Sequence, residues 1–247
     1  MQITTMGLVI REIKTGEADR ILHILTPEYG VISALAKGSQ RLKSKLFSAT
    51  GLFCYAEFTM FNGKSMYIVD EAQVHEVFFG LRQSVEGMAL AMYFAELVAT
   101  LLPQGAEAQN LLRLLLNSLS FIANDKMNMR LLKPVFELRT LTIAGYMPDV
   151  VACSSCAKYE GGAFYFDESA GDIYCGDCAK ARGLSANIDA SALAAIRHIV
   201  FSDDEKLFGF TLPDASVRKL YTVIERYAQY SVDKPLRSME FLNTVFT

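Results

Sequence analysis

The sequence predicts an α+β protein in which a five-stranded β-barrel precedes a helical domain that carries an inserted cysteine module. The chain has 247 residues, of which 51% are hydrophobic, so it can bury a large core and divide into compact units. The hydrophobic pattern first repeats about every two residues and then, from Arg82 onward, about every 3.6 residues. Two closely spaced cysteine pairs interrupt the helical pattern. We expect domains at 1–80, 81–150, 151–182 and 183–247, of which the third is the cysteine module and the second and fourth are helical.

The N-terminal region contains five short runs of alternating hydrophobic and polar residues that we expect to be strands. The runs are 6–13, 18–26, 31–37, 52–61 and 65–71. Turn-forming residues separate them, and Asn62-Gly63 is a strong signal for a two-residue hairpin. Five antiparallel strands in this pattern fit an OB-fold barrel, although an SH3-like barrel would leave the same pattern in the sequence.

Helical periodicity then predicts a group of helices. Hydrophobic residues in 88–101 fall on one face of a helix, and those in 111–122 form a second stripe. A third helix is expected in 128–145, and the last helical pattern covers about 214–230. The one-sided patterns indicate that these helices pack against one another in a core.

Four of the five cysteines form two C-x2-C pairs with the spacing of a zinc site. Cys153 and Cys156 form the first pair, and Cys175 and Cys178 form the second. Two such pairs supply the four thiolates of a tetrahedral shell, so we expect one structural Zn2+ ion in a zinc ribbon or knuckle. Four protein ligands leave no open position for a catalytic water, and the ion should stabilise the fold. The alternative is that the four thiols bind no metal. The fifth cysteine, Cys54, is expected to be a core residue.

A second segment, residues 37–47, concentrates positive charge although the formal net charge of the chain is −3. It contains four cations and no acidic residue, together with serines that can bond to phosphate oxygens. On a barrel loop this arrangement is suited to binding the phosphate backbone of DNA. An ordinary solvated loop explains the composition equally well. The candidate DNA-binding residues are Lys37, Arg41, Lys43 and Lys45, extended by Arg11 and Arg20.

Apparent catalytic motifs are incomplete, so we do not expect an enzyme. Gly63-Lys64-Ser65 resembles the end of a phosphate-binding loop but lacks its first glycine, and His75-Glu76 lacks the second histidine of a metalloprotease motif. The N-terminal residues lack the pattern of a secretory signal, and the apolar segments are too short to span a membrane. We therefore expect a cytoplasmic protein without a membrane partner.

Short motifs along nearly the whole chain form a specific combination. They are GLVIR (7–11), EADRIL (17–22), TPEYG (26–30), AKGSQRLKS (36–44), FELR (136–139) and GYMPD (145–149), together with the two cysteine pairs. In this order and spacing they resemble the bacterial RecO family of DNA repair and recombination mediator proteins. The resemblance implies an N-terminal OB-fold, a helical domain and a zinc module, without enzyme activity.

The resemblance also implies a function based on binding. Proteins of this family bind single- and double-stranded DNA, anneal complementary strands and, with RecR, help load RecA onto DNA coated by single-stranded DNA-binding protein. Some bind the C-terminal tail of that protein in an apolar pocket beside a cation, for which Arg113, Arg130, Lys133 and Arg139 are candidates here. The resemblance places DNA contact on the basic barrel loop and the protein at the nucleoid. The alternative function is a zinc-ribbon protein-interaction scaffold without direct DNA binding.

Overall fold

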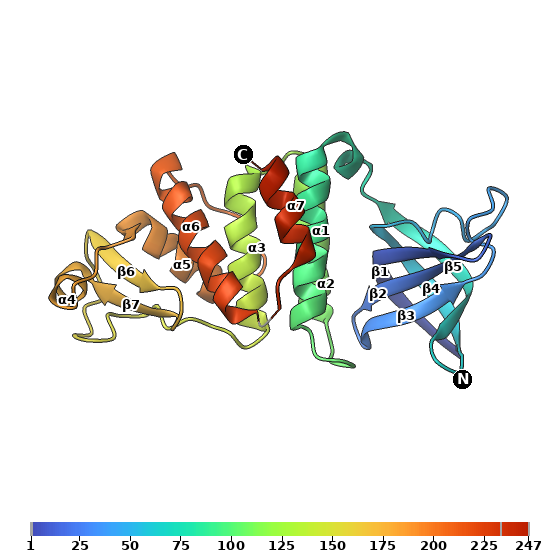
Figure 1. Ribbon diagram of the computed structural model, residues 1–247, viewed down its shortest axis with the longest axis horizontal. Helices are drawn as coiled ribbons and strands as arrows, with labels where there is room; N and C mark the ends of the chain where they lie inside the picture. The colour runs from blue at the N-terminus through green and yellow to red at the C-terminus, as the bar shows by residue number, and fades with distance from the viewer. Residues whose placement is uncertain (1, 233, 247) are drawn as a thin grey trace. The chain divides into compact units, whose positions relative to one another are not determined.

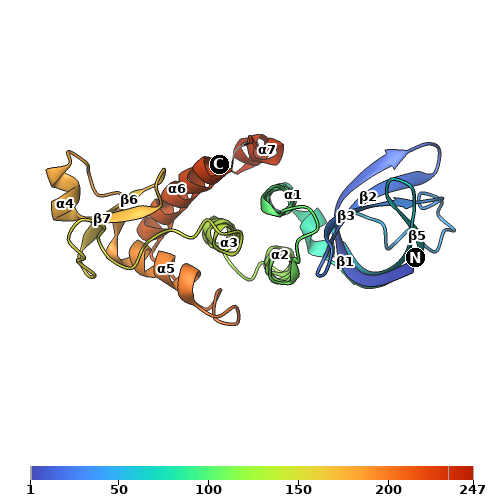
Figure 2. The same cartoon turned by 90° about the horizontal axis from the view of Figure 1, so that it is seen from below.

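A computed structural model describes residues 2–232 and 234–246, which form two compact units (Figures 1 and 2). Unit 1 comprises residues 2–124 together with 238–246, and unit 2 comprises the described residues from 125 to 237. Unit 1 contains the strands of the N-terminal sheet, and unit 2 contains the four clustered cysteines. No helix among the described residues is long and apolar enough to cross a membrane.

Unit 1 begins with the five expected strands, which close into a barrel in the order β1-β2-β3-β5-β4 (Figure 1). They are β1 (Gln2–Thr15), β2 (Asp19–Thr26), β3 (Gly30–Ala36), β4 (Cys54–Asn62) and β5 (Tyr67–Val77). The expected antiparallel pairing is present in four of the five neighbouring strand pairs, whereas β3 and β5 pair in parallel, with Leu35 opposite Ile68. A closed ring with an odd number of strands cannot alternate direction throughout, so at least one neighbouring pair must be parallel.

Alternation along the strands buries one side of each strand inside the barrel. In β2, Leu22 and Ile24 are fully buried, and Phe58 and Met60 are fully buried in β4. Cys54 lies in the same core, and burial raises the pKa of its thiol to about 11. Cys54 is therefore a core residue, as the sequence predicts.

Helical segments complete unit 1. They are the 3-10 helix η1 (Phe79–Gln83), α1 (Val85–Leu101), α2 (Gln109–Ala123) and α7 (Arg237–Val245). The hydroxyl of Ser84 caps α1 by accepting a hydrogen bond from a backbone N–H of its first turn at 2.9 Å. The chain at η1 passes α2 so closely that a Cβ atom on Gly80 would lie 1.9 Å from the carbonyl oxygen of Ala123. α7 contacts α1, where the backbone N–H of Ser238 donates to Glu96 Oε2 at 2.8 Å.

Unit 2 packs α3 against α5 and α6, with a small sheet in the same unit (Figure 1). Its elements are α3 (Met129–Ile143), β6 (Ala163–Asp167), β7 (Asp172–Cys175), α4 (Gly176–Ala181), β8 (Ile188–Asp189), α5 (Ala190–Phe201) and α6 (Asp214–Ser231). The fully buried ammonium of Lys133 lies 2.8 Å from Glu137 Oε1 and 3.0 Å from Glu225 Oε1. Burial acts to lower the pKa of Lys133, but these two carboxylates outweigh it and the net shift is upward. The ion pairs therefore join α3 to α6 in the interior of unit 2.

Candidate metal centre and basic loop

The four expected cysteine ligands come together in unit 2. Cys153 and Cys156 belong to the loop before β6, Cys175 ends β7, and Cys178 lies in α4. Their sulfur atoms all lie within 4.8 Å of one another, and the Sγ atoms of Cys156 and Cys175 are 3.7 Å apart. Zinc–sulfur bonds of about 2.3 Å arranged as a tetrahedron separate the sulfur atoms by roughly 3.8 Å. The cluster is therefore compatible with zinc binding.

Backbone hydrogen bonds shape the first cysteine pair into a tight turn. The N–H of Ala157 donates to the carbonyl oxygen of Cys153 at 2.8 Å, and the N–H of Cys153 donates to the carbonyl oxygen of Lys158 at 2.9 Å. Ala157 closes the turn in the left-handed region, with a φ of 57°. Lys158 Nζ lies 3.4 Å from Asp177 Oδ2, which sits between the two cysteines of the second pair. Contacts of the chain itself therefore hold the two pairs near each other.

The pKa values of two of the clustered thiols, Cys153 and Cys178, shift in opposite directions. Burial acts to raise the pKa of Cys153, but hydrogen bonds from the backbone of Cys175, Ser155 and Cys156 outweigh it and lower this pKa to about 6. Hydrogen bonds shared with Cys156 and Cys175 raise the pKa of Cys178 to about 12. Four thiolates held this close together repel one another, so they require the positive charge of a bound cation.

The basic segment forms an ordered loop between β3 and β4. Successive backbone hydrogen bonds run through the loop. The N–H of Arg41 donates to the carbonyl oxygen of Gly38 at 3.1 Å, that of Ser44 to the carbonyl oxygen of Arg41 at 2.8 Å, and that of Phe47 to the carbonyl oxygen of Ser44 at 3.1 Å. None of the ion pairs formed by the described residues involves the cations of this loop. The exposed cations on it are Lys37, Arg41, Lys43 and Lys45.

Two anchors hold this loop on the barrel. At its start, the backbone N–H of Gly38 donates to Asp19 Oδ1, and the side-chain amide of Gln40 donates to the carbonyl oxygen of Asp19, both at 2.7 Å. At its end, Leu46 and Ala49 are buried in the barrel core. The cations are therefore presented by a loop whose two ends are fixed.

Arg20 lies beneath this loop, in contrast to the other candidate DNA-binding residues. It is only 9% exposed. Its Nη1 donates to Thr50 Oγ1 at 2.6 Å and to Phe47 O at 3.3 Å, and its Nε lies 3.5 Å from Glu12 Oε2. Thr50 in turn donates to the carbonyl oxygen of Leu46 at 2.8 Å. Arg20 therefore holds the loop in place, and its contact with DNA stays a prediction.

Arg11 is exposed on β1, where it is paired with His23 of β2. Burial and the charge of Arg11 together lower the pKa of His23. No hydrogen bond or ion pair between described residues joins Arg11 to the basic loop. Of the six candidates, the structure thus gathers four on the loop, leaves Arg11 on a strand and turns Arg20 inward.

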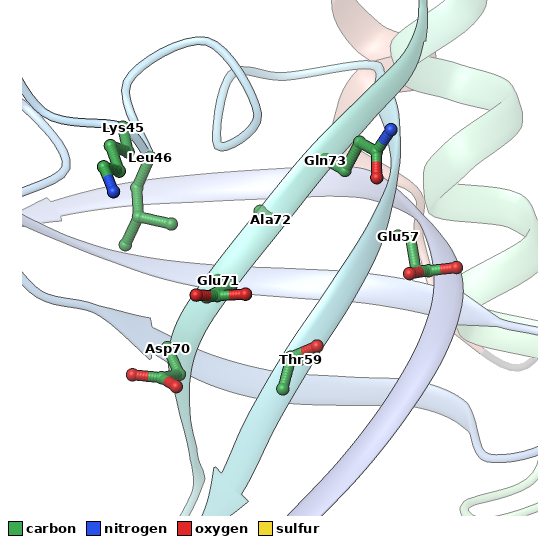
Figure 3. A pocket seen from close by; sticks show the side chains of 8 residues that line it. All are labelled: Lys45, Leu46, Glu57, Thr59, Asp70, Glu71, Ala72 and Gln73. Atoms are coloured by element: carbon green, nitrogen blue, oxygen red, sulfur yellow. The ribbon is translucent and has the colours of Figure 1, made fainter.

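A groove of about 310 Å³ separates the basic loop from β4 and β5 (Figure 3). Lys45 and Leu46 line it on the loop side, and the carboxylates of Glu57, Asp70 and Glu71 line it on the strands. Carboxylates repel phosphate groups, so this side of the loop is unfavourable for a DNA backbone. The sequence does not reveal this groove, because its acidic residues are distant from the loop along the chain.

A second groove, of about 410 Å³, lies at the end of the barrel where the β1–β2 and β4–β5 connections approach each other. Residues 15–16 and 63–65 border it, and Ile21, Leu35 and Ile68 line its floor. Asp19, which anchors the basic loop, also lines this groove. The groove and the start of the basic loop are therefore neighbours on the barrel surface.

The floor of this second groove belongs to a row of apolar side chains that crosses all five strands. In the strand pairing the row runs through Ile13, Ile21, Leu35, Ile68 and Phe61. Its two end members remain exposed, Ile13 by 38% and Phe61 by 42%. Outward-facing strand positions are normally polar, so a continuous apolar row marks a candidate binding surface. Sequence reasoning missed this row because it depends on strand register.

Comparisons with known proteins agree with this architecture. The family model described as Recombination protein O N terminal matches residues 1–78, and the one described as Recombination protein O C terminal matches residues 82–240. The DNA repair protein RecO of Acetivibrio thermocellus is 34% identical over 243 residues, which cover 98% of this chain and 97% of the relative. The DNA repair protein RecO of Alkaliphilus metalliredigens is 28% identical over 95% of this chain. That of Dehalococcoides mccartyi is 29% identical over 98% of this chain. Each match covers 95% of the relative. This chain therefore belongs to the RecO family.

Proposed function

We propose that this protein binds single- and double-stranded DNA during repair and recombination, and that it acts by binding without catalysing a reaction. The observation that carries the proposal is the basic loop, which presents exposed cations and no acidic residue from two fixed ends. The relatives are named DNA repair proteins, which supports the same role. We place the protein in the cytoplasm, at the nucleoid.

The proposed phosphate contacts are the exposed cations of the loop, with Arg11 as an additional contact from β1. The acidic groove in Figure 3 favours a path for the DNA backbone on the opposite side of the loop. Lys45 borders that groove, so we expect it to contribute less than Arg41 and Lys43. Four phosphate contacts with a single strand correspond to a log–log slope of affinity against salt of about −3.

We also propose that the barrel is an OB-fold and that the bases of a single strand lie against its apolar groove. OB-folds bind oligonucleotides on strands 2 and 3, between the connection of strands 1 and 2 and that of strands 4 and 5. Here the same two connections border the groove, and Ile21, Leu35 and Ile68 form its floor. Apolar contact with base faces does not depend on base identity, so this binding should tolerate many sequences.

For the four clustered cysteines we propose one structural Zn2+ ion. The sulfur separation supports it, because 3.7 Å between Cys156 and Cys175 suits a tetrahedral thiolate shell. Bound zinc would be held by Cys153, Cys156, Cys175 and Cys178 and would neutralise their negative charges. Four thiolates leave no coordination position for an activated water, so this ion would stabilise unit 2.

Partner proteins complete the proposed role. We propose that the protein anneals complementary strands and, with RecR, helps load RecA onto DNA coated by single-stranded DNA-binding protein. We place the C-terminal tail of that coating protein on the helical part of the chain. Lys133 is fully buried against Glu137, and Arg139 pairs with Asp204 at 2.6 Å, so we exclude both as the cation that receives the tail. Arg130 is exposed near the start of α3 and is our candidate.

Fluorescence anisotropy with a labelled single strand tests DNA binding. The loop variant carries Arg41→Ala, Lys43→Ala and Lys45→Ala. Its affinity should fall at least about tenfold at moderate salt, and its salt slope should become shallower by roughly 2, because three phosphate contacts are lost. A strand-annealing assay with and without single-stranded DNA-binding protein then tests the mediator role.

A matched control removes the same charge from exposed positions outside unit 1. It carries Lys126→Ala, Arg218→Ala and Lys234→Ala. This control should bind single-stranded DNA like the unaltered protein. If the loop variant binds as tightly as the control, the phosphate site is wrong. If the unaltered protein binds no DNA at low salt, the interaction scaffold replaces DNA binding as the function.

A further inference from the structure

Leu42 occupies an unusual position at the tip of the basic loop. It is 85% exposed, more than any other large hydrophobic residue that the structure describes. Arg41 and Lys43 on either side of it are exposed as well, and the turn is closed by a hydrogen bond from the N–H of Ser44 to the carbonyl oxygen of Arg41 at 2.8 Å. Polar residues, glycine and proline normally occupy turn tips. A leucine there exposes apolar surface that the fold itself does not cover.

The leucine cannot easily fold back onto the barrel, because both sides of its turn are held. On one side, the N–H of Arg41 donates to Gly38 O at 3.1 Å, and Gly38 is bound in turn by Asp19 at 2.7 Å. On the other side, Leu46 is buried in the barrel core. The loop therefore projects Leu42 into solvent as part of an ordered turn.

We propose that Leu42 inserts between neighbouring bases of a DNA strand whose phosphates are bound by Arg41 and Lys43. This proposal rests on the proposed function, because it requires DNA on the basic loop. The flanking cations select a polyanion, and the apolar surface that a DNA strand offers is the face of its bases. Leucine and similar side chains act as wedges between base steps in several kinds of DNA-binding protein. An apolar pocket on a partner protein fits less well, because the two flanking cations would lose hydration along with the leucine.

The wedge and its flanking cations make separable contributions to binding. Arg41 and Lys43 act through phosphate charge, so their contribution depends on salt and little on base stacking. Leu42 acts through base faces, so its contribution changes stacking and depends little on salt. Paired bases must be unstacked before the leucine can enter, and Leu42 should therefore favour single strands over duplexes.

A single strand containing 2-aminopurine tests the wedge with the full-length protein, because the emission of this base analogue rises when its stacking is lost. Leu42→Ser removes the apolar side chain, and Leu42→Met keeps it. We expect emission to rise on saturation with the unaltered protein and with Leu42→Met, and the rise to be at least halved with Leu42→Ser. The affinity of Leu42→Ser for the single strand should fall about fivefold while its salt slope stays the same.

Lys43→Ala is the matched control for the neighbouring charge. It should make the salt slope shallower by roughly 0.7 and leave the emission rise of the saturated complex intact. Equal emission rises for Leu42→Ser and the unaltered protein at saturation would overturn the wedge and point to a protein partner for the leucine. Absence of any anisotropy change with the unaltered protein would instead refute the proposed DNA binding itself, so the two failures are distinguishable. Thermal unfolding should be the same for all three variants, because these side chains are exposed.

Discussion

Replacement of Arg20 by alanine should destabilise unit 1, because this side chain ties the basic loop to the barrel. Its Nη1 donates to Thr50 Oγ1 at 2.6 Å and to Phe47 O at 3.3 Å. A hydrogen bond from a charged donor contributes about 1.5–3 kcal/mol, and the two bonds share one nitrogen, so their contributions do not simply add. The pair with Glu12 adds less, since that carboxylate is 28% exposed. Arg20→Ala should therefore lower the free energy of unfolding by about 2–4 kcal/mol.

Urea unfolding followed by circular dichroism measures this effect. Because the chain has two compact units, the curve should be fitted with two transitions, of which only the one for unit 1 should move. Arg20→Lys should also destabilise unit 1, because an ammonium group cannot replace the planar donors of the guanidinium. The matched control, Arg11→Ala, removes an exposed arginine from β1 and should change stability by less than about 0.5 kcal/mol.

Binding measurements separate a supporting role from direct DNA contact. If Arg20 only holds the loop, Arg20→Lys should weaken binding to single-stranded DNA although it keeps the charge. If Arg20 contacts phosphate, Arg20→Lys should bind nearly as well as the unaltered protein. A result in which Arg20→Ala is as stable as Arg11→Ala, yet loses as much affinity as Arg41→Ala, would refute our assignment.

Three further predictions concern unit 2. Denatured protein should release about one equivalent of zinc per chain to a colorimetric chelator, and the Cys156→Ser variant should release much less. A fully folded preparation without metal would contradict the zinc site. Asp189 caps α5 and lies 3.0 Å from Lys219, so Asp189→Ala should cost about 1–2 kcal/mol at neutral pH in urea unfolding. Burial acts to raise the pKa of Asp189, but its hydrogen bonds and the charge of Lys219 lower this pKa overall. The stabilisation by Asp189 should therefore be present above about pH 4 and be lost as the pH falls through the lowered pKa. An equal cost of Asp189→Ala at pH 2 and pH 7 would contradict this prediction. Lys133→Met leaves the buried Glu137 without its closest cation and should lower the free energy of unfolding by about 3–5 kcal/mol. Adding Glu137→Leu should restore much of this stability. If urea unfolding shows no recovery in the double variant, this account is contradicted.

The strands and the cysteine cluster could be predicted because their signals are local. Alternating hydrophobic residues identify the five strands, with differences of up to six residues at their ends, because a strand exposes alternate side chains to different surroundings. The short spacing within each cysteine pair brings two sulfur atoms together whatever the rest of the fold does. The exposure of Arg41 and Lys43 follows from their place in a charged connection between strands.

The remaining features of the site depend on side-chain direction and strand register, and the hydrophobic pattern of the sequence contains only part of that information. Arg20 is in phase with Leu22 and Ile24, two inward-facing residues of the same strand, so alternation already placed its side chain on the core side. The charge of Arg20 also made it a candidate for DNA contact, which stays a prediction. Ile13 and Phe61 join one apolar row only because β1 pairs with β2 and β4 pairs with β5 in the observed register. No local signal specifies that pairing.

The contact of α7 with α1 affects how the chain can fold during synthesis on the ribosome. Unit 1 is incomplete until residues 238–246 have been made, because Ser238 bonds to Glu96 of α1 and Leu242 of α7 is buried. At about 5–20 residues per second, translation of unit 2 delays α7 by roughly 5–20 s after the barrel and α2 have emerged. During this interval the part of α1 that later receives α7 stays uncovered. The first unit to leave the ribosome is thus the last to be finished.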